Sequence, residues 1–96
     1  NKDFNKRQMD ELFEAILSLK TKEEVHAFLD DLCTVKELLS LSQRYEVAKL
    51  LRENNTYLEI AEKTGASTAT ISRVNRALNY GNNGYNTVIE RTEKKD

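Results

Sequence analysis

Apolar residues recur at helical spacing along most of the chain. Between residues 2 and 20 they fall on one face, at intervals of three, four and seven positions, which predicts an amphipathic helix. They are Phe4, Met9, Leu12, Phe13, Ile16, Leu17 and Leu19. A second apolar stripe follows Thr21, which forms a capping-box pattern with Glu24, and this helix should end close to Cys33.

A third helix is expected over residues 35–52. Thr34 and Glu37 form another capping-box pattern at its start, and neither Gly nor Pro interrupts the apolar stripe that follows. Ser40 with Gln43 could instead cap a fresh start within this stretch. Because nothing breaks the run, one long helix is the preferred interpretation.

Residues 56–78 form the most informative stretch, because they read as two short helices joined by a tight turn. Thr56 can cap the first helix, Gly65 can end it by adopting a positive φ, and Ser67 can cap the second. Leu58, Ile60 and Ala61 are predicted to share one face of the first helix, and Ile71, Val74 and Leu78 follow at helical spacing in the second. Ile71 and Val74 are predicted to fill the angle between the two helices. This pattern is the helix-turn-helix signature, in which the second helix enters the major groove of DNA.

A last helix is expected over residues 85–91, after a loop over residues 79–84. The 96 residues include no Pro and no Trp, with 39% hydrophobic and 32% charged residues, a composition typical of helices with narrow apolar stripes. We therefore predict an all-α protein of about six helices forming a single domain over residues 1–96. The helices within residues 2–33 carry more apolar surface than one such chain can cover, which predicts a homodimer joined through them.

The formal net charge is −1, but it is unevenly distributed. Residues 1–41 hold six Lys or Arg against nine Asp or Glu, a net charge of −3; residues 42–96 hold nine against seven, a net charge of +2. Arg73 and Arg76 lie between Thr64 and Gly81, where no acidic residue occurs. The local field at the second helix of the motif is therefore positive, which favours contact with phosphates.

Candidates for catalytic or metal-binding chemistry are scarce. Cys33 is the only cysteine and His26 the only histidine, so the chain has neither an internal disulfide nor the usual ligand spacing of a zinc site. No nucleophile–base pair, distinctive carboxylate pair or phosphate-binding glycine loop is visible. We predict no catalytic residue, no metal and no enzymatic activity. Since no apolar run approaches the length of a membrane span, a cytoplasmic protein without a membrane partner is expected.

The exposed start of the second motif helix holds the side chains expected to meet DNA. Hydroxyl groups can bond bases or phosphates, a methyl group can contact thymine, and arginine suits a guanine edge or a phosphate. The predicted groove-facing residues are Ser67, Thr68, Ala69, Thr70, Ser72 and Arg73. Further candidates for backbone contacts are Arg76, Asn75, Tyr57, Lys63 and Arg52.

Several local runs carry a family resemblance. They are the helix from Thr34 to Leu51, EIA before GAS at residues 59–67, ATISR at residues 69–73, and NRALNYG at residues 75–81. On these runs the chain resembles the Trp repressor family, and within it the YerC/YecD group of Trp-repressor-like proteins. The resemblance implies an all-helical, intertwined homodimer that binds a double-stranded DNA operator and regulates transcription, most often by repression.

The resemblance also implies positions for an effector. In the Trp repressor two arginines enclose the indole ring, and they match Arg44 and Arg73, while the threonine at the head of the long helix matches Thr34. A glycine and a serine of that pocket correspond here to Val74 and Ala77. Because a β-branched side chain would occupy part of the pocket, these changes argue against L-tryptophan as the effector, and no cofactor is predicted.

The sequence also allows a second function. The chain could be a protein-interaction adaptor that keeps the helix-turn-helix shape without reading DNA. The net charge of −1 and the modest number of Lys and Arg residues favour this alternative. Salt separates the two functions, because phosphate binding weakens steeply as salt increases.

Overall fold

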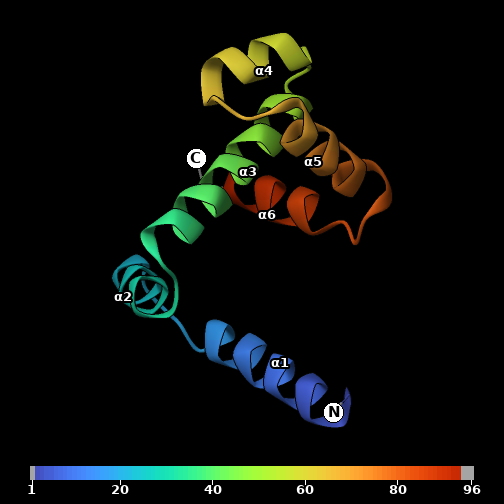
Figure 1. Cartoon of the computed structure of the whole chain (residues 1–96). Helices are drawn as coiled ribbons and strands as arrows, with labels where there is room; N and C mark the ends of the chain where they lie inside the picture. The colour runs from blue at the N-terminus through green and yellow to red at the C-terminus, as the bar shows by residue number, and fades with distance from the viewer. Residues whose placement is uncertain (1, 94–96) are drawn as a thin grey trace. The chain divides into compact units, whose positions relative to one another are not determined.

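The computed structural model describes residues 2–93, which form six α-helices and no strand (Figure 1). The helices are α1 (Lys2–Leu17), α2 (Lys22–Leu32), α3 (Val35–Arg52), α4 (Tyr57–Thr64), α5 (Thr68–Tyr80) and α6 (Gly84–Glu93). The all-α prediction is confirmed, and α3 is the single long helix expected. Among the described residues, no helix is both long and apolar enough to cross a membrane.

Several helix ends differ from the predicted ones; α6, predicted over residues 85–91, runs from Gly84 to Glu93. α1 ends at Leu17 rather than Lys20, because the backbone tightens there: the Ser18 amide bonds the Ala15 carbonyl at 3.2 Å and the Leu19 amide bonds the Ile16 carbonyl at 3.2 Å. α5 extends past Leu78 to Tyr80 and ends where the chain turns at Gly81.

The predicted caps at the starts of α2 and α3 form to different extents. At α3 the reciprocal pair is complete, because Thr34 Oγ1 accepts from the Glu37 amide at 3.0 Å and the Glu37 carboxylate accepts from the Thr34 amide at 2.8 Å. At α2, Thr21 Oγ1 accepts from the Glu24 amide at 3.1 Å, but the Glu24 carboxylate bonds the Lys20 amide instead. Only half of the predicted capping box therefore forms at Thr21.

The chain divides between Leu38 and Leu39 into two compact units. The N-terminal unit has no buried residue in α1 or α2. The C-terminal unit holds the core, which consists of Val47, Ala48, Leu50, Ile60, Ala66, Ile71, Val74 and Ile89. This core joins α3, α4, α5 and α6, so it fixes the helix-turn-helix on the long helix.

The prediction that Leu58 shares one face of α4 with Ile60 is wrong, since Leu58 is 70% exposed and Ile60 is fully buried. Leu58 lies two positions before the buried Ile60, and two positions rotate a side chain by about 200° around a helix. Ile60, and Thr64 one turn later, take the inward face of α4 instead. The predicted inward positions Ile71 and Val74 are fully buried.

Candidate nucleic-acid interface

The first helix of the motif is fixed at both ends by local chemistry. At its start, Thr56 Oγ1 accepts from the Glu59 amide at 3.1 Å and the Glu59 carboxylate accepts from the Thr56 amide at 2.7 Å, a complete capping box. These bonds hold the pKa of Glu59 below its usual value. At its end, Gly65 adopts φ 74° and its amide bonds the Ala61 carbonyl at 2.8 Å. The turn therefore has a defined geometry.

The start of α5 is capped by Ser67, as predicted. Its hydroxyl accepts from the Thr70 amide at 3.1 Å and lies within hydrogen-bond distance, 3.1 Å, of the Thr70 hydroxyl. Both hydroxyl groups, predicted to meet DNA, thus already have partners inside the protein. Ser67 serves first as a helix cap, and Thr70 is half-buried.

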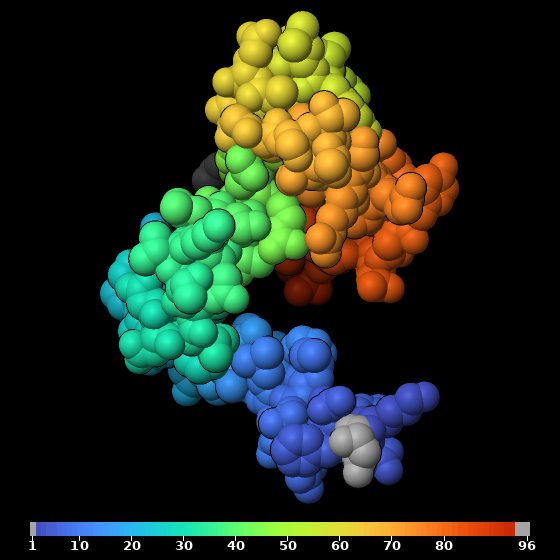
Figure 2. Space-filling view, in the orientation of Figure 1, coloured from blue at the N-terminus to red at the C-terminus, as the bar shows by residue number. Residues whose placement is uncertain are grey.

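The remaining predicted groove residues form one exposed face of α5. Thr68 and Ser72 are one turn apart, and so are Ala69 and Arg73, with Arg76 three positions further. Within residues 2–93 the side chains of these five residues make no hydrogen bond or ion pair. No acidic residue occurs in the first turn of α5, and in Figure 2 the α5 surface, in orange, is open beside α4, in yellow. This exposed α5 face is free to bind an anionic ligand.

Of the flanking candidates, Lys63 and Arg52 already have partners, whereas Tyr57 has none in the described chain. Lys63 Nζ donates to Asn55 Oδ1 at 3.0 Å. The Arg52 guanidinium bonds Glu90 at 3.5 Å and the Asn86 carbonyl at 3.4 Å, which places it against α6. Tyr57 is 37% exposed at the first position of α4.

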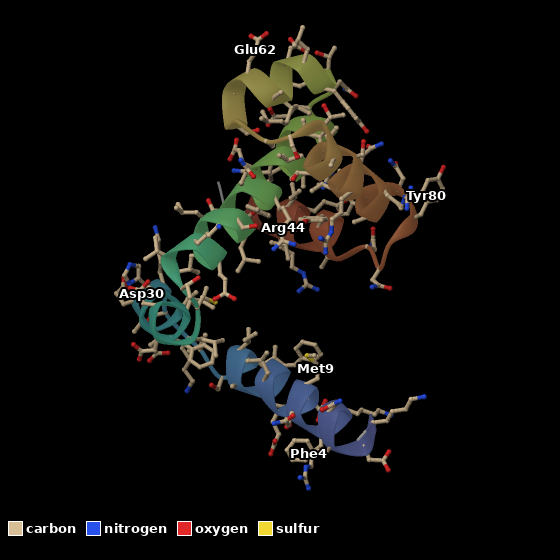
Figure 3. All side chains as sticks on the ribbon, in the orientation of Figure 1. Phe4, Met9, Asp30, Arg44, Glu62 and Tyr80 are labelled. Carbon is tan, nitrogen blue, oxygen red and sulfur yellow. The ribbon has the colours of Figure 1, made fainter. Side chains whose placement is uncertain are left out.

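Asn75, the other backbone candidate, accepts a hydrogen bond from Asn79 one turn later on α5. At the far end of this helix, the side chain of Tyr80 projects outward and is 87% exposed (Figure 3). Sequence reasoning gave Tyr80 no role.

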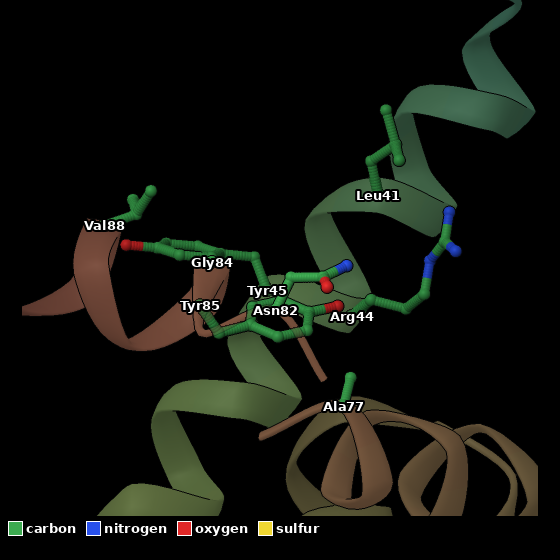
Figure 4. Close-up of a pocket in the computed structure, with 8 residues that line it drawn as sticks. All are labelled: Leu41, Arg44, Tyr45, Ala77, Asn82, Gly84, Tyr85 and Val88. Atoms are coloured by element: carbon green, nitrogen blue, oxygen red, sulfur yellow. The ribbon is translucent and has the colours of Figure 1, made fainter. Parts of the chain in front are cut away.

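The two arginines predicted to enclose an effector do not line the same hollow. Arg44 lines an open hollow of ≈ 560 Å³ together with Leu41, Tyr45, Ala77, Asn82, Gly84, Tyr85 and Val88. Neither Arg73 nor Val74 is among its lining residues, and Val74 is only 1% exposed. Figure 4 shows the Tyr85 ring extending from α6 toward α3 and the Arg44 guanidinium pointing away from both tyrosine rings. The hydroxyl of Thr34 is engaged in the α3 cap.

One polar residue of this region was missed by the sequence analysis. Gln43 was considered as part of a possible cap, but its Nε2 donates to the Thr64 carbonyl in the motif turn at 3.1 Å. The two residues lie 21 positions apart, and no local pattern pairs them.

Comparison with known proteins places this architecture in a family. A family model described as Trp repressor protein matches residues 7–93. The chain is 56% identical over 90 residues to the uncharacterized protein YerC of Bacillus subtilis strain 168, covering 94% of this chain and 86% of that protein. It is 39% identical over 80 residues to a Trp operon repressor homolog of Chlamydia trachomatis, covering 76% of this chain and 83% of the homolog.

Solved structures agree with the sequence relatives. The crystal structure of a TrpR-like protein from Eubacterium eligens matches with a TM-score of 0.89 and 62% identity, covering 97% of this chain and 96% of that one. A putative Trp repressor from Staphylococcus aureus matches with a TM-score of 0.87 and 52% identity, covering 91% of this chain and 87% of that one. The chain therefore belongs to the Trp repressor family as a YerC-type member and has the fold of a DNA-binding regulator.

Proposed function

We propose that the protein is a homodimeric transcriptional repressor that binds a specific double-stranded DNA operator through α5. The observation that carries the proposal is the exposed α5 face: five residues without partners inside the described chain, on a helix whose opposite side is buried. The name of the Chlamydia relative, a Trp operon repressor homolog, supports repression as the effect.

The chemistry of this face gives each residue a role. Arg73 reads a guanine edge or binds a phosphate, the Ala69 methyl group contacts a thymine methyl group, and the hydroxyls of Thr68 and Ser72 bond bases or phosphates. Arg76, further along α5, binds the DNA backbone. Because hydroxyl groups outnumber bidentate readers here, DNA shape and bridging water should supply much of the specificity.

Apolar exposure in the N-terminal unit supports the homodimer. Phe13 is 54% exposed, Ile16 45% and Leu17 81%, and α1 and α2 together bury no residue. Helices of this length are marginal on their own in water, so these faces need a partner. A second copy offers the same faces, and a self-complementary contact closes as a dimer. The α1 and α2 helices would thus form the dimerisation segment, intertwined with the partner as in the family.

We further propose that L-tryptophan is not the effector. The buried Val74 occupies the position of the family's pocket glycine, Ala77 lacks a hydroxyl group, and Arg73 does not line the hollow that contains Arg44. Titration of the protein with L-tryptophan should therefore leave its affinity for DNA unchanged.

A matched pair of arginine variants tests the function. Arg73→Ala should weaken binding to a duplex selected by the wild-type protein about tenfold or more, because it removes a base-edge or phosphate contact. Arg91→Ala removes the same charge from the exposed side of α6 and should leave the affinity nearly unchanged. Fluorescence anisotropy over a range of salt concentrations measures both. No binding to any duplex, or equal losses in the two variants, would refute the proposal.

The adaptor function has one specific observation in its favour. Leu58 is 70% exposed beside the partly exposed Tyr57 on α4, an apolar surface suited to a protein partner. Such a protein complex should survive high salt and should weaken in Leu58→Ser. DNA binding should instead weaken steeply as the salt concentration rises.

A further inference from the structure

One side chain of α3 reaches directly into the motif turn. Gln43 Nε2 donates to the Thr64 carbonyl at 3.1 Å, in a partly buried hydrogen bond. We propose that Gln43 is a positioning residue that sets the orientation of the α4–turn–α5 motif on α3, and hence the placement of the exposed α5 face on DNA. This inference rests on the proposed function and assigns a residue that positions the DNA-reading face.

Thr64 connects this bond to the start of α5. Its hydroxyl donates to the Ile60 carbonyl at 2.7 Å and accepts from the Ala66 amide at 3.1 Å. Gly65, which lies between Thr64 and Ala66, adopts the left-handed conformation. Thr64 therefore has its carbonyl tied to α3 and its hydroxyl tied to both sides of the turn, so a shift of its carbonyl moves the first residues of α5.

The hydrogen bond between Gln43 and Thr64 lies beside an open cleft of the C-terminal unit. A cleft of ≈ 360 Å³ is lined by Leu39, Ser42, Gln43, Glu46, Lys63 and Thr64. Within the described residues, Gln43 makes the only hydrogen bond from an α3 side chain to α4 or its following turn. The other contacts between α3 and the motif are apolar and come from the core, where Val47 and Ile60 are fully buried. The core fixes the motif on α3 by close packing, and the hydrogen bond adds a directional restraint at the turn itself.

The other end of α4 is held differently. Asn55 Nδ2 donates to the Leu50 carbonyl at 3.0 Å and its Oδ1 accepts from Lys63 at 3.0 Å. Asn55 lies five positions after Leu50, so it fixes the entry into α4 locally. At the exit from α4, Ala66 is buried in the core, and Gln43 supplies the hydrogen bond from α3.

Losing this bond should affect specificity more than stability. The Thr64 carbonyl lies at a helix end beside an open cleft, where water can replace the amide, so the net contribution of the bond to folding is modest. Contacts to base edges tolerate a displacement of α5 far less, because the side chains that read the groove must be held closely in place. Contacts to phosphates, which give non-specific binding, depend less on the angle of α5.

The test compares two DNA duplexes in the full chain. A duplex is first selected by the wild-type protein from a randomised pool, and a scrambled duplex of the same composition serves as the non-specific probe. Gln43→Met and Gln43→Glu, which both lose the donor, should lower the preference for the selected duplex by about tenfold. Affinity for the scrambled duplex should change by less than about twofold in Gln43→Met.

Two further variants separate positioning from general damage. Gln43→Arg retains N–H donors at similar reach and should recover most of the preference. Ser42→Ala alters the same cleft at a side chain that makes no hydrogen bond in the described chain, and it should keep the full preference. Thermal unfolding of each variant shows whether the fold is retained.

The outcomes distinguish this inference from the function beneath it. A preference that survives in Gln43→Met and Gln43→Glu overturns the positioning role alone. Equal losses on both duplexes, together with a lower unfolding temperature, also overturn it by assigning Gln43 a purely structural role. If the wild-type protein selects no duplex, the proposed function fails, and the inference with it.

Discussion

The two units differ in how far they bury the same kinds of apolar side chain. In the C-terminal unit, Ile60, Ile71 and Ile89 are at most 1% exposed, whereas in the N-terminal unit Ile16 is 45% exposed within the same chain. Both units have amphipathic helices, so the apolar pattern of each helix alone does not explain the difference. Four C-terminal helices meet around a shared core, while α1 and α2 bury no residue. The C-terminal unit therefore has a core of its own, whereas α1 and α2 contribute no buried residue to one.

The largest expected effect comes from placing a charge on α1. Phe13→Glu should abolish the proposed dimer, because each dimer would bury two unpaired carboxylates at the interface. The C-terminal helices should remain folded, since their core does not include Phe13. Sedimentation equilibrium measures the mass, and far-ultraviolet circular dichroism measures the helix content.

The matching control for this variant is Ala27→Glu, which adds the same charge at an exposed position on α2, away from the apolar stripe. It should remain dimeric. A wild-type protein that sediments as a monomer, or a Phe13→Glu variant that sediments as a dimer, would contradict the role given to the N-terminal helices.

A smaller side chain in the core tests how much the C-terminal unit depends on its buried contacts. Ile71→Ala should lower the free energy of unfolding by about 2–5 kcal/mol, because it leaves a cavity among buried residues. Leu58→Ala removes apolar atoms from the same motif at a side chain that is 70% exposed, and it should change the free energy by less than about 1 kcal/mol. Urea unfolding of both variants gives the two values, and similar values would mean that Leu58 is buried in the assembled protein.

The hydroxyl groups of α5 offer a smaller and sharper test. Ser67→Ala should lower the free energy of unfolding by about 1 kcal/mol, because it removes the cap of α5. Ser72→Ala should leave stability almost unchanged and weaken DNA binding, since its hydroxyl has no partner in the described chain. Thermal unfolding and DNA affinity, measured on both variants, separate a capping role from a DNA-contact role. Identical effects on stability would remove the distinction.

Sequence predicted the elements whose signals are local. The caps at Thr56 and Ser67, the left-handed Gly65 and the helix-turn-helix they define depend on residues within four positions of one another. Residues 35–52 were predicted as one helix because nothing interrupts them. The family resemblance rested on these same runs and is confirmed by the relatives.

The parts that sequence missed depend on contacts between distant residues. Gln43 bonds Thr64 across 21 positions, and Arg52 bonds Glu90 across 38, which holds Arg52 against α6 rather than leaving it free for a phosphate. Leu58 differs from its prediction because its angle around α4 relative to Ile60, rather than its apolar character, decides which face of the helix it takes. A residue pattern gives the face of a helix, but only packing shows which polar side chains are already engaged.

The smallest expected effect is a pH dependence at the start of α4. The carboxylate of Glu59 accepts the Thr56 amide, which lowers the pKa of Glu59 in the folded protein. A lowered pKa contributes stability that is fully present above the pKa of the unfolded chain and is lost as pH falls through the folded value. Glu59→Gln keeps an acceptor but removes this charge. The unfolding temperature of the wild-type protein should therefore exceed that of Glu59→Gln at neutral pH, and the gap should narrow below about pH 5.

Glu62→Gln provides the control for this pH dependence. Glu62 lies on the same helix and is exposed, as Figure 3 also shows, but its carboxylate accepts no hydrogen bond in the described part of the chain. The difference in unfolding temperature between Glu62→Gln and the wild-type protein should stay nearly constant with pH. If the Glu59→Gln gap is equally constant, the capping carboxylate makes no charge-dependent contribution, and the stability of the motif start comes from Thr56 and the core beneath Ile60. A gap that narrows only for Glu59 would show that part of the motif's stability arises from the carboxylate in its own first turn.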